Sequence, residues 1–200
     1  MKNTPRDTGW IEAICGSMFS GKTEELIRRA RRAQFARQKV QLFKPALDDR
    51  FAQDAIASHD RRSLECVSLV RIADLYRHLD PDTDVVGLDE AQFFGDELVP
   101  VCEELANRGY RVIVAALDQD YRGRPFGPVP QLLCVAEYVT KSLAICVSCG
   151  NPANRSQRIH GGDDTVQVGA GESYEPRCRA CFRPDVIRQE SMPMEPGEDA

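Results

Sequence analysis

Short runs of apolar residues alternate with longer amphipathic stretches along the first three quarters of the chain. Such runs are typical of strands that are buried on both faces of a sheet. The predicted strands span 10–15, 39–43, 85–88, 111–117 and 139–146. Between them, apolar residues recur at helical spacing, which predicts helices over 22–38, 72–79, 98–108 and 129–138.

This alternation of strands and helices indicates the α/β fold class, with a parallel sheet flanked by helices. The polar stretch 46–62 shows no period, and we interpret it as a mobile loop. Four arginines within residues 28–32 lie on the first helix, where we expect a solvated or subunit-contact face.

The pattern changes near Cys146. From there to Phe182 the chain is rich in glycine, polar residues and cysteine, and it has no helical period. A segment of this kind cannot bury much apolar surface, so it needs an added cross-link to hold a structure. We therefore expect a second, small unit after the α/β domain, followed by a disordered acidic tail over 189–200.

Composition narrows the class of protein. The chain of 200 residues is 42% apolar and 28% charged, which is typical of a globular domain, and its net charge is −5. This mild acidity argues against coating of nucleic acid or of an anionic membrane. No apolar run approaches the roughly 20 residues of a membrane helix, and residues 1–8 do not resemble a signal peptide. We expect a cytoplasmic protein.

A glycine-rich motif follows the first predicted strand. Residues 16–23 match the phosphate-loop pattern G-x-x-x-x-G-K-[ST] at every fixed position. Backbone N–H groups of such a loop bind phosphate, Lys22 would reach the β- and γ-phosphates, and the Thr23 hydroxyl would bind Mg²⁺. The predicted ATP-binding residues of the loop are Gly16, Ser17, Met18, Phe19, Ser20, Gly21, Lys22 and Thr23.

Two carboxylates, Asp89 and Glu90, end the predicted strand 85–88. At this position Asp89 would hold Mg²⁺, usually through water, and Glu90 would serve as general base for an attacking hydroxyl. If that hydroxyl belongs to water, the protein is an ATPase, and if it belongs to a bound alcohol, the protein is a kinase. The acidic pair alone does not distinguish these reactions. A purely structural role, in which both acids cap the following turn, is a further alternative.

Eight cysteines are present. Cys15, Cys66, Cys102 and Cys134 are isolated, and we expect small buried side chains there. The other four form two Cys-x-x-Cys pairs, which could complete a closed, structural Zn²⁺ shell. Disulfides, free thiols or an iron–sulfur cluster are the alternatives. The four candidate zinc ligands are Cys146, Cys149, Cys178 and Cys181.

Together these motifs resemble the zinc-containing, tetrameric type of thymidine kinase. Besides the phosphate loop and the cysteine pairs, the resemblance rests on residues 89–94, 115–118 with 124–127, and 168–174. It covers about residues 10–183 and implies a P-loop ATP-binding domain over 9–143 and a zinc-binding lasso domain over 144–188. Residues 1–8 would form a flexible tail.

The resemblance also implies a reaction. The γ-phosphate of ATP, bound with Mg²⁺, would pass to the 5′-hydroxyl of thymidine, with Glu90 as general base and Gln92 among the ATP-binding residues. Asp48 and Arg50 would lie near the transferred phosphate. The substrate-binding residues that it implies are Met18, Phe93, Leu117, Tyr121, Phe126, Val168, Gly169, Ala170, Gly171 and Tyr174. A homotetramer and feedback inhibition by thymidine triphosphate are further implications.

Two positions depart from the family pattern. The lasso usually carries two glycines where this chain has Gly169 and Ala170, so Gly171 would have to supply any positive φ. Tyr121 brings a hydroxyl into a pocket for a base. A nucleic-acid-stimulated ATPase with a zinc ribbon and a non-catalytic nucleotide switch remain as competing functions, although the negative charge disfavours the first.

Overall fold

The computed structural model describes residues 8–46, 55–57, 63–160 and 173–184. Its centre is a six-stranded sheet in the order β5-β2-β6-β7-β1-β8, and every neighbouring pair in it is parallel. The strands are β1 (Trp10–Gly16), β2 (Val40–Pro45), β5 (Val67–Leu69), β6 (Val85–Leu88), β7 (Arg111–Ala116) and β8 (Tyr138–Ser142). The predicted α/β class with a parallel sheet is confirmed.

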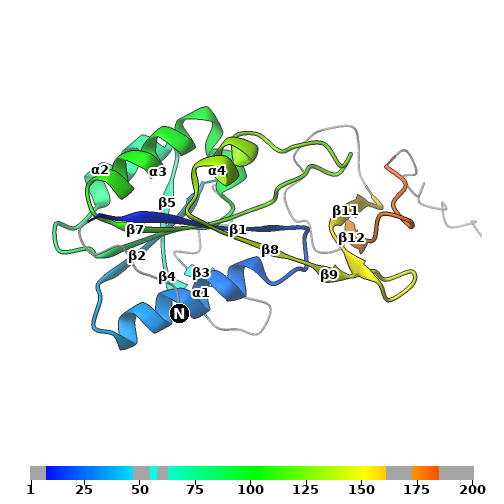
Figure 1. The fold of residues 1–200 in the computed structure, drawn as a ribbon, viewed down its shortest axis with the longest axis horizontal. Coiled ribbons are helices and arrows are strands. Elements are labelled where there is room, and N and C mark those ends of the chain that lie inside the picture. Colours follow the sequence, from blue (N-terminus) through cyan, green and yellow to red (C-terminus); the bar gives the residue numbers. More distant parts are fainter. Residues whose placement is uncertain (1–7, 47–54, 58–62, 161–172, 185–200) are drawn as a thin grey trace, which may run out of the picture.

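Helices cover both faces of the sheet (Figure 1). One face carries α1 (Lys22–Phe35), and the other carries α2 (Leu75–His78), α3 (Leu98–Asn107) and α4 (Val129–Val135). Two 3₁₀ segments, η2 (Ile72–Asp74) and η3 (Ala91–Glu97), precede α2 and α3. The core is split accordingly: Leu26 and Ile27 of α1 pack in one apolar cluster, while Leu98 and Leu105 of α3 pack in the other.

Smaller strands complete the chain. β3 (Ala55–Ala57) pairs antiparallel with β4 (Ser63–Glu65), β9 (Ala144–Ile145) pairs with β10 (Pro152–Ala153), and β11 (Arg155–Arg158) pairs with β12 (Tyr174–Arg177). The β9–β12 strands lie beyond one end of the main sheet, where β8 leads into β9 (Figure 1). In the part of the chain that the structure describes, no helix is long and apolar enough to cross a membrane.

Several predicted boundaries were wrong. The first helix ends at Phe35 rather than near residue 38, because Arg37 takes a positive φ of 61°. The helix predicted over 129–138 ends at Val135, and Tyr138 instead begins β8, paired with Glu12. The stretch 46–62 is not loop throughout, because β3 lies within it.

Two predictions about side chains also need correction. Arg29 is buried rather than solvated: its Nη1 lies 2.7 Å from Glu12 Oε2, and its Nε lies 2.8 Å from Glu25 Oε1. A buried carboxylate partner balances the guanidinium charge there. Cys15, Cys66 and Cys102 are buried as predicted, but Cys134 is exposed because it lies on the outer side of α4.

Candidate active site

The strand order places three functional segments at one edge of the sheet. β6, β7 and β1 are successive strands of the sheet and run parallel, so their carboxyl ends lie at the same edge. The phosphate loop follows β1, Asp89 and Glu90 follow β6, and Asp118 follows β7. Ligands of open α/β sheets bind outside the carboxyl ends of the strands, and the candidate site lies there.

Glycine is required at the beginning of the phosphate loop. Gly16 has a φ of +145°, and a Cβ atom on it would lie 2.2 Å from the carbonyl oxygen of Ser142 in β8. Gly21, immediately before α1, has a φ of +78°. Phe19 also adopts a positive φ, of 63°, and its side chain is exposed. The loop therefore turns sharply between a buried strand and the N-terminus of a 14-residue helix.

Lys22 is buried within the loop that it follows. Its Nζ donates a hydrogen bond of 2.8 Å to the carbonyl oxygen of Ser17. Burial lowers the pKa of Lys22, while the nearby carboxylates of Glu90 and Asp89 act in the opposite direction. Lys22 and Asp89 are thus both buried, and the half-buried Glu90 lies close enough to act on Lys22.

Asp89 and Thr23 face each other across the site. The Thr23 hydroxyl donates a hydrogen bond to Asp89, with 3.1 Å between Oγ1 and Oδ2. Burial and, to a lesser extent, the charge of Glu90 raise the pKa of Asp89 to about 7. A hydroxyl and a carboxylate so placed are oxygen groups that could hold a Mg²⁺ ion.

Glu90 has a left-handed backbone conformation, with φ 49°. Few residues other than glycine adopt this conformation, and strained positions of this kind cluster at functional sites. Its Oε2 accepts a hydrogen bond of 2.6 Å from Nε2 of Gln92. Oε1 of Gln92 in turn accepts one of 3.0 Å from the backbone N–H of Leu117. The buried Gln92 side chain therefore bridges Glu90 to the end of β7.

Aromatic side chains surround the end of β7. Phe93 and Phe126 contact each other edge to face, with ring centroids 5.5 Å apart. Tyr121 is buried, and the guanidinium carbon of Arg158 lies 3.7 Å from its ring centroid. The hydroxyl of Tyr174 accepts hydrogen bonds from Arg158 Nη2 at 2.6 Å and from Nε at 3.1 Å.

Further contacts join the phosphate loop to the β9–β12 unit. The backbone N–H of Met18 donates to Oγ of Ser156 at 3.0 Å, and Oγ of Ser17 donates to the carbonyl oxygen of Ala153 at 3.3 Å. The structure thus brings to the site Ser156 and Arg158, to which the sequence analysis gave no role. Their only sequence signal was their position between the two cysteine pairs.

Asp118 lies in the stretch 115–118 on which the family resemblance rests, but the sequence analysis gave it no role. Its Oδ2 lies 2.5 Å from Nζ of Lys141, whereas Oδ1 is buried and has no hydrogen-bond partner in the part of the chain that the structure describes. A carboxylate that directly follows an apolar strand run, as Asp89 does, was the signal that could have identified it.

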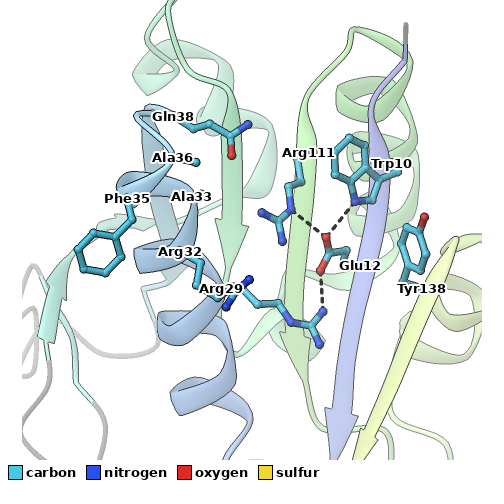
Figure 2. A pocket seen from close by; sticks show the side chains of 10 residues that line it. All are labelled: Trp10, Glu12, Arg29, Arg32, Ala33, Phe35, Ala36, Gln38, Arg111 and Tyr138. Carbon is cyan, nitrogen blue, oxygen red and sulfur yellow. Dashed lines mark hydrogen bonds and ion pairs between the residues drawn. The ribbon is translucent and has the colours of Figure 1, made fainter. Parts of the chain in front are cut away.

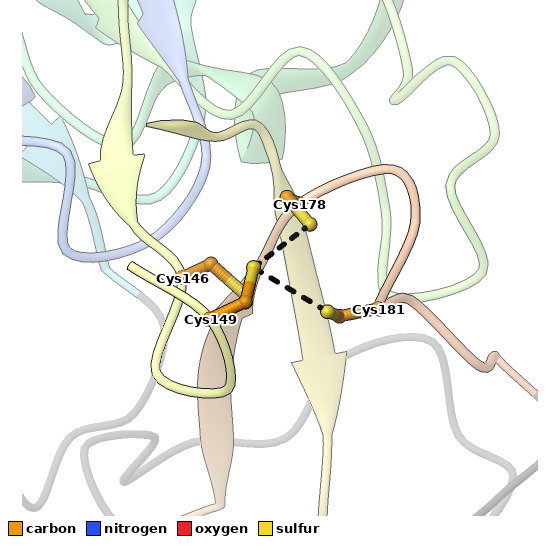
Figure 3. Close-up of side chains that lie close together, drawn as sticks. All are labelled: Cys146, Cys149, Cys178 and Cys181. Carbon is orange, nitrogen blue, oxygen red and sulfur yellow. Dashed lines mark hydrogen bonds between the residues drawn. The ribbon is translucent and has the colours of Figure 1, made fainter. Parts of the chain in front are cut away.

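The four cysteines of the two Cys-x-x-Cys pairs lie together, as predicted (Figure 3). All four sulfur atoms are within 4.8 Å of one another. Cys149 Sγ lies 3.6 Å from Cys178 Sγ and 3.5 Å from Cys181 Sγ, well beyond the S–S distance of about 2.05 Å in a disulfide. Four thiolates at about 2.3 Å from Zn²⁺ have sulfurs roughly 3.8 Å apart, so the cluster fits a tetrahedral ion.

The pKa of two of these thiols, Cys146 and Cys178, is lowered, while hydrogen bonds with Cys149 and Cys178 raise the pKa of Cys181 to about 12. Although burial raises the pKa of Cys146, hydrogen bonds from the backbone N–H groups of Cys178, Ser148 and Cys149 lower it to about 6 overall. Metal ions bind the thiolate form of cysteine, and a low pKa favours that form. The cluster is therefore a chemically suitable metal site.

Some predicted residues fall outside the described part of the chain. These are the two residues expected near the phosphate and the first part of the lasso, namely Asp48, Arg50, Val168, Gly169, Ala170 and Gly171. The predicted pocket residues within the described part of the chain are Met18, Phe93, Leu117, Tyr121, Phe126 and Tyr174.

The sequence was compared with models of protein families. The model of the family described as thymidine kinase matches residues 9–182. The match spans the parallel sheet, the phosphate loop, the acidic pair and the cysteine cluster. The chain therefore belongs to the thymidine kinase family.

Proposed function

We propose that the protein transfers the γ-phosphate of ATP to the 5′-hydroxyl of thymidine, giving thymidine monophosphate and ADP. Membership of the family supports phosphorylation of thymidine in general. The observation that carries the specific reaction is the position of Glu90 beside the phosphate loop, where its charge acts on Lys22. A carboxylate there can take the proton of a bound alcohol.

The phosphate-binding groups are assigned as follows. Backbone N–H groups of residues 16–23 bind the β- and γ-phosphates, and Lys22 exchanges its contact with the Ser17 carbonyl for a phosphate oxygen. Thr23 and Asp89 would hold Mg²⁺, which neutralises charge on the phosphates. The direct contact between Thr23 and Asp89 supports this pairing.

Glu90 is assigned as the general base. Gln92 holds Oε2 of Glu90 by a hydrogen bond, and its other end is held by the N–H of Leu117, so the base is oriented by a side chain that is itself fixed at both ends. The sequence resemblance placed Gln92 among the ATP-binding residues. The contacts with Glu90 and Leu117 favour an orienting role.

The thymidine pocket is assigned to the aromatic residues near the end of β7 and to the lasso, residues 168–174. Rings such as Phe93 and Phe126 offer apolar faces to a planar base, and the pair already has the edge-to-face geometry of a pocket wall. Leu117, Met18 and Tyr121 would complete the wall. Asp48 and Arg50 would approach the transferred phosphate.

We assign one structural Zn²⁺ ion to the cluster of four cysteines. Four cysteine ligands leave no open coordination position, so such an ion contributes stability rather than catalysis. Among the residues that the structure describes, the small core around the cysteines consists of Ala144, Cys146, Ala153 and Cys178, with Cys181 packed against them. We assign 9–143 to an ATP-binding domain and 144–188 to a zinc-binding lasso domain.

The family resemblance supports three broader proposals. The enzyme works in the cytoplasm in nucleotide salvage, assembles as a homotetramer, and is inhibited by thymidine triphosphate. Size-exclusion chromatography with light scattering would measure the molar mass of the assembly, and we expect four times the 22.4 kDa of one chain.

The first experiment measures the transfer of labelled γ-phosphate from ATP with Mg²⁺ to a panel of nucleosides, with single-stranded DNA as a control. Label on thymidine, but not on cytidine or purine nucleosides, is expected, and deoxyuridine would show the breadth of base selection. Free phosphate released in a DNA-stimulated, thymidine-independent reaction would instead mean that Glu90 activates water.

A further inference from the structure

A second cavity lies at the opposite end of the sheet from the phosphate loop. It has a volume of about 660 Å³ and opens between the C-terminal half of α1 and the first residues of β1, β7 and β8 (Figure 2). Trp10 lines it at the start of β1, and Gly16 begins the phosphate loop at the other end of the same strand. At about 3.3 Å per residue, the two are roughly 20 Å apart.

The lining of this cavity has an excess of positive charge. Three arginines line it, Arg29, Arg32 and Arg111, against a single carboxylate, Glu12. Both carboxylate oxygens of Glu12 already accept hydrogen bonds. Its Oε2 accepts a hydrogen bond from Arg29, and its Oε1 accepts bonds from Arg111 Nε at 2.8 Å and Trp10 Nε1 at 2.9 Å (Figure 2).

Guanidinium N–H groups at the cavity therefore remain available to a ligand. Arg111 uses only Nε for Glu12, and within the described residues its Nη atoms have no hydrogen-bond partner. Arg32 is exposed, lies one helical turn after Arg29, and likewise has no ion-pair partner in the described ranges. Arg29 is paired with both Glu12 and Glu25, so Arg32 and the Nη atoms of Arg111 are the donors that remain for an anion such as a phosphate monoester.

Aromatic surface lies next to these charges. Trp10 and Tyr138 are half-buried in the wall, and the Phe35 ring at the rim is 88% exposed. The guanidinium carbon of Arg111 lies 5.9 Å from the centroid of the Trp10 ring. A cavity of this size with flat apolar walls and a few convergent donors is the usual form of a small-molecule site.

From this combination we propose that the cavity binds an aromatic phosphate monoester, of which nucleoside monophosphates are the natural class. Arg32 and the Nη atoms of Arg111 donate to the phosphate, in the planar geometry that guanidinium groups offer to such anions. The ring of the ligand packs against Trp10. The proposal concerns binding only and does not depend on the phosphoryl transfer proposed above.

Trp10 is the only tryptophan of the chain, so intrinsic fluorescence reports directly on this cavity. The experiment titrates the full-length protein with adenosine monophosphate and with thymidine monophosphate, and with adenosine and inorganic phosphate alone as partial ligands. Saturable quenching is expected for both nucleotides. Each partial ligand should bind at least tenfold more weakly, because it offers only the ring or only the charge.

Variants locate the signal. Arg32→Ala should weaken nucleotide quenching about tenfold or more, since a charge-assisted hydrogen bond is lost. Arg31→Ala removes the same charge from the same helix but from a residue outside the cavity lining, and should change little. Lys22→Ala, which disables the phosphate loop, should leave the quenching intact.

Three results would overturn the proposal. Quenching that survives Arg32→Ala, or that disappears in Lys22→Ala, would place the nucleotide elsewhere. Inorganic phosphate as effective as the nucleotides would show a simple ionic effect. Sedimentation in which Arg32→Ala changes the molar mass, without any nucleotide-dependent fluorescence, would mean that a second copy of the chain covers this face.

Discussion

Glu90 combines a strained backbone with a carboxylate that is restrained at Oε2, and this combination points to chemistry rather than to packing. Its positive φ aims the carboxylate from the end of β6, and Gln92 restrains it. Glu90→Gln keeps the shape but cannot accept a proton. We expect kcat for thymidine phosphorylation to fall about 100-fold or more, with little change in ATP affinity.

Glu97→Gln provides the matched control, because it removes the same charge from an exposed residue of the neighbouring 3₁₀ segment. Single-turnover transfer and equilibrium nucleotide binding would be measured for both variants. Transfer at near wild-type rate by Glu90→Gln would show that another group takes the proton.

Glu12 is a buried carboxylate whose stability contribution depends on pH. Burial alone would raise its pKa, but hydrogen bonds from Arg111 and Trp10 and the charges of Arg111 and Arg29 lower it below its ordinary value. A carboxyl group with a depressed native pKa stabilises the fold above its unfolded pKa of about 4.5 and loses that effect at lower pH.

Replacing Glu12 with glutamine leaves Arg29 with one fewer partner in a buried position. We expect Glu12→Gln to reduce the free energy of unfolding by about 3 kcal/mol at pH 7. Denaturant titrations between pH 7 and pH 3 should show the difference from wild type shrinking below about pH 4.5. A difference independent of pH would rule out the ionised carboxylate as its source. Glu104→Gln, at an exposed carboxylate that contacts Arg108 and accepts a hydrogen bond from the Tyr76 hydroxyl, should cost less than 1 kcal/mol.

At the scale of elements, one side chain connects three segments. Arg158 of β11 donates to Tyr174 of β12 and packs on Tyr121 in the loop after β7. It is 1% exposed, so its charge is held by these groups rather than by water. This arrangement ties the end of the proposed lasso to the sheet domain.

Lysine keeps the charge of Arg158 but loses the planar stacking surface and the paired donors. We therefore expect Arg158→Lys to raise the KM for thymidine about tenfold, with a smaller change in kcat and none in the KM for ATP. Arg179→Lys, at an exposed position of the same unit, is the control. A fall in kcat with an unchanged thymidine KM would contradict a positioning role.

Most elements could be predicted from sequence because their pattern is local. The strand 85–88 is purely apolar, and it is found with the predicted bounds as β6. The errors arose where long-range contacts decide the structure. The local pattern places Tyr138 at the end of a helix, but its pairing with Glu12 places it in the sheet. The local pattern likewise predicts a solvated Arg29, but the ion pair with Glu12 keeps it buried.

The candidate site divides in the same way. Lys22, Thr23, Asp89 and the four cysteines belong to spaced motifs whose chemistry fixes the residue types, so sequence could identify them. Ser156 and Arg158 belong to no motif. Their contacts exist only because β10 and β11 fold back onto the phosphate loop and the loop after β7.

The whole molecule consists of a large sheet with an ample core and a small unit with almost none. The two main clusters contain many fully buried side chains, whereas the core around the cysteines contains four buried residues. We therefore expect the small unit to need a metal ion at the cysteine cluster for its stability, and the sheet not to need one.

Removal of the metal by a strong chelator should accordingly have unequal effects. We expect hydrogen exchange in β9–β12 to become fast, while β1, β6 and β7 remain protected and thymidine phosphorylation is lost. Elemental analysis should find one zinc ion per chain beforehand. Cys149→Ser should behave as the chelated protein does, and Cys134→Ser, at an exposed cysteine outside the cluster, should not. Unchanged exchange after metal removal would argue against this division of stability.

The short segment between β8 and the cysteine cluster limits where insertions and deletions can occur in this family. Ser142 pairs with Gly16 of the phosphate loop, and only residues 143–145 separate it from Cys146. Side chains alternate sides along an extended chain, so one inserted or deleted residue would turn Cys146 away from the other three sulfurs. Over evolution, the exposed residues of this link, Leu143 and Ile145, can vary, but its length cannot, and alignments of related chains should be free of gaps there.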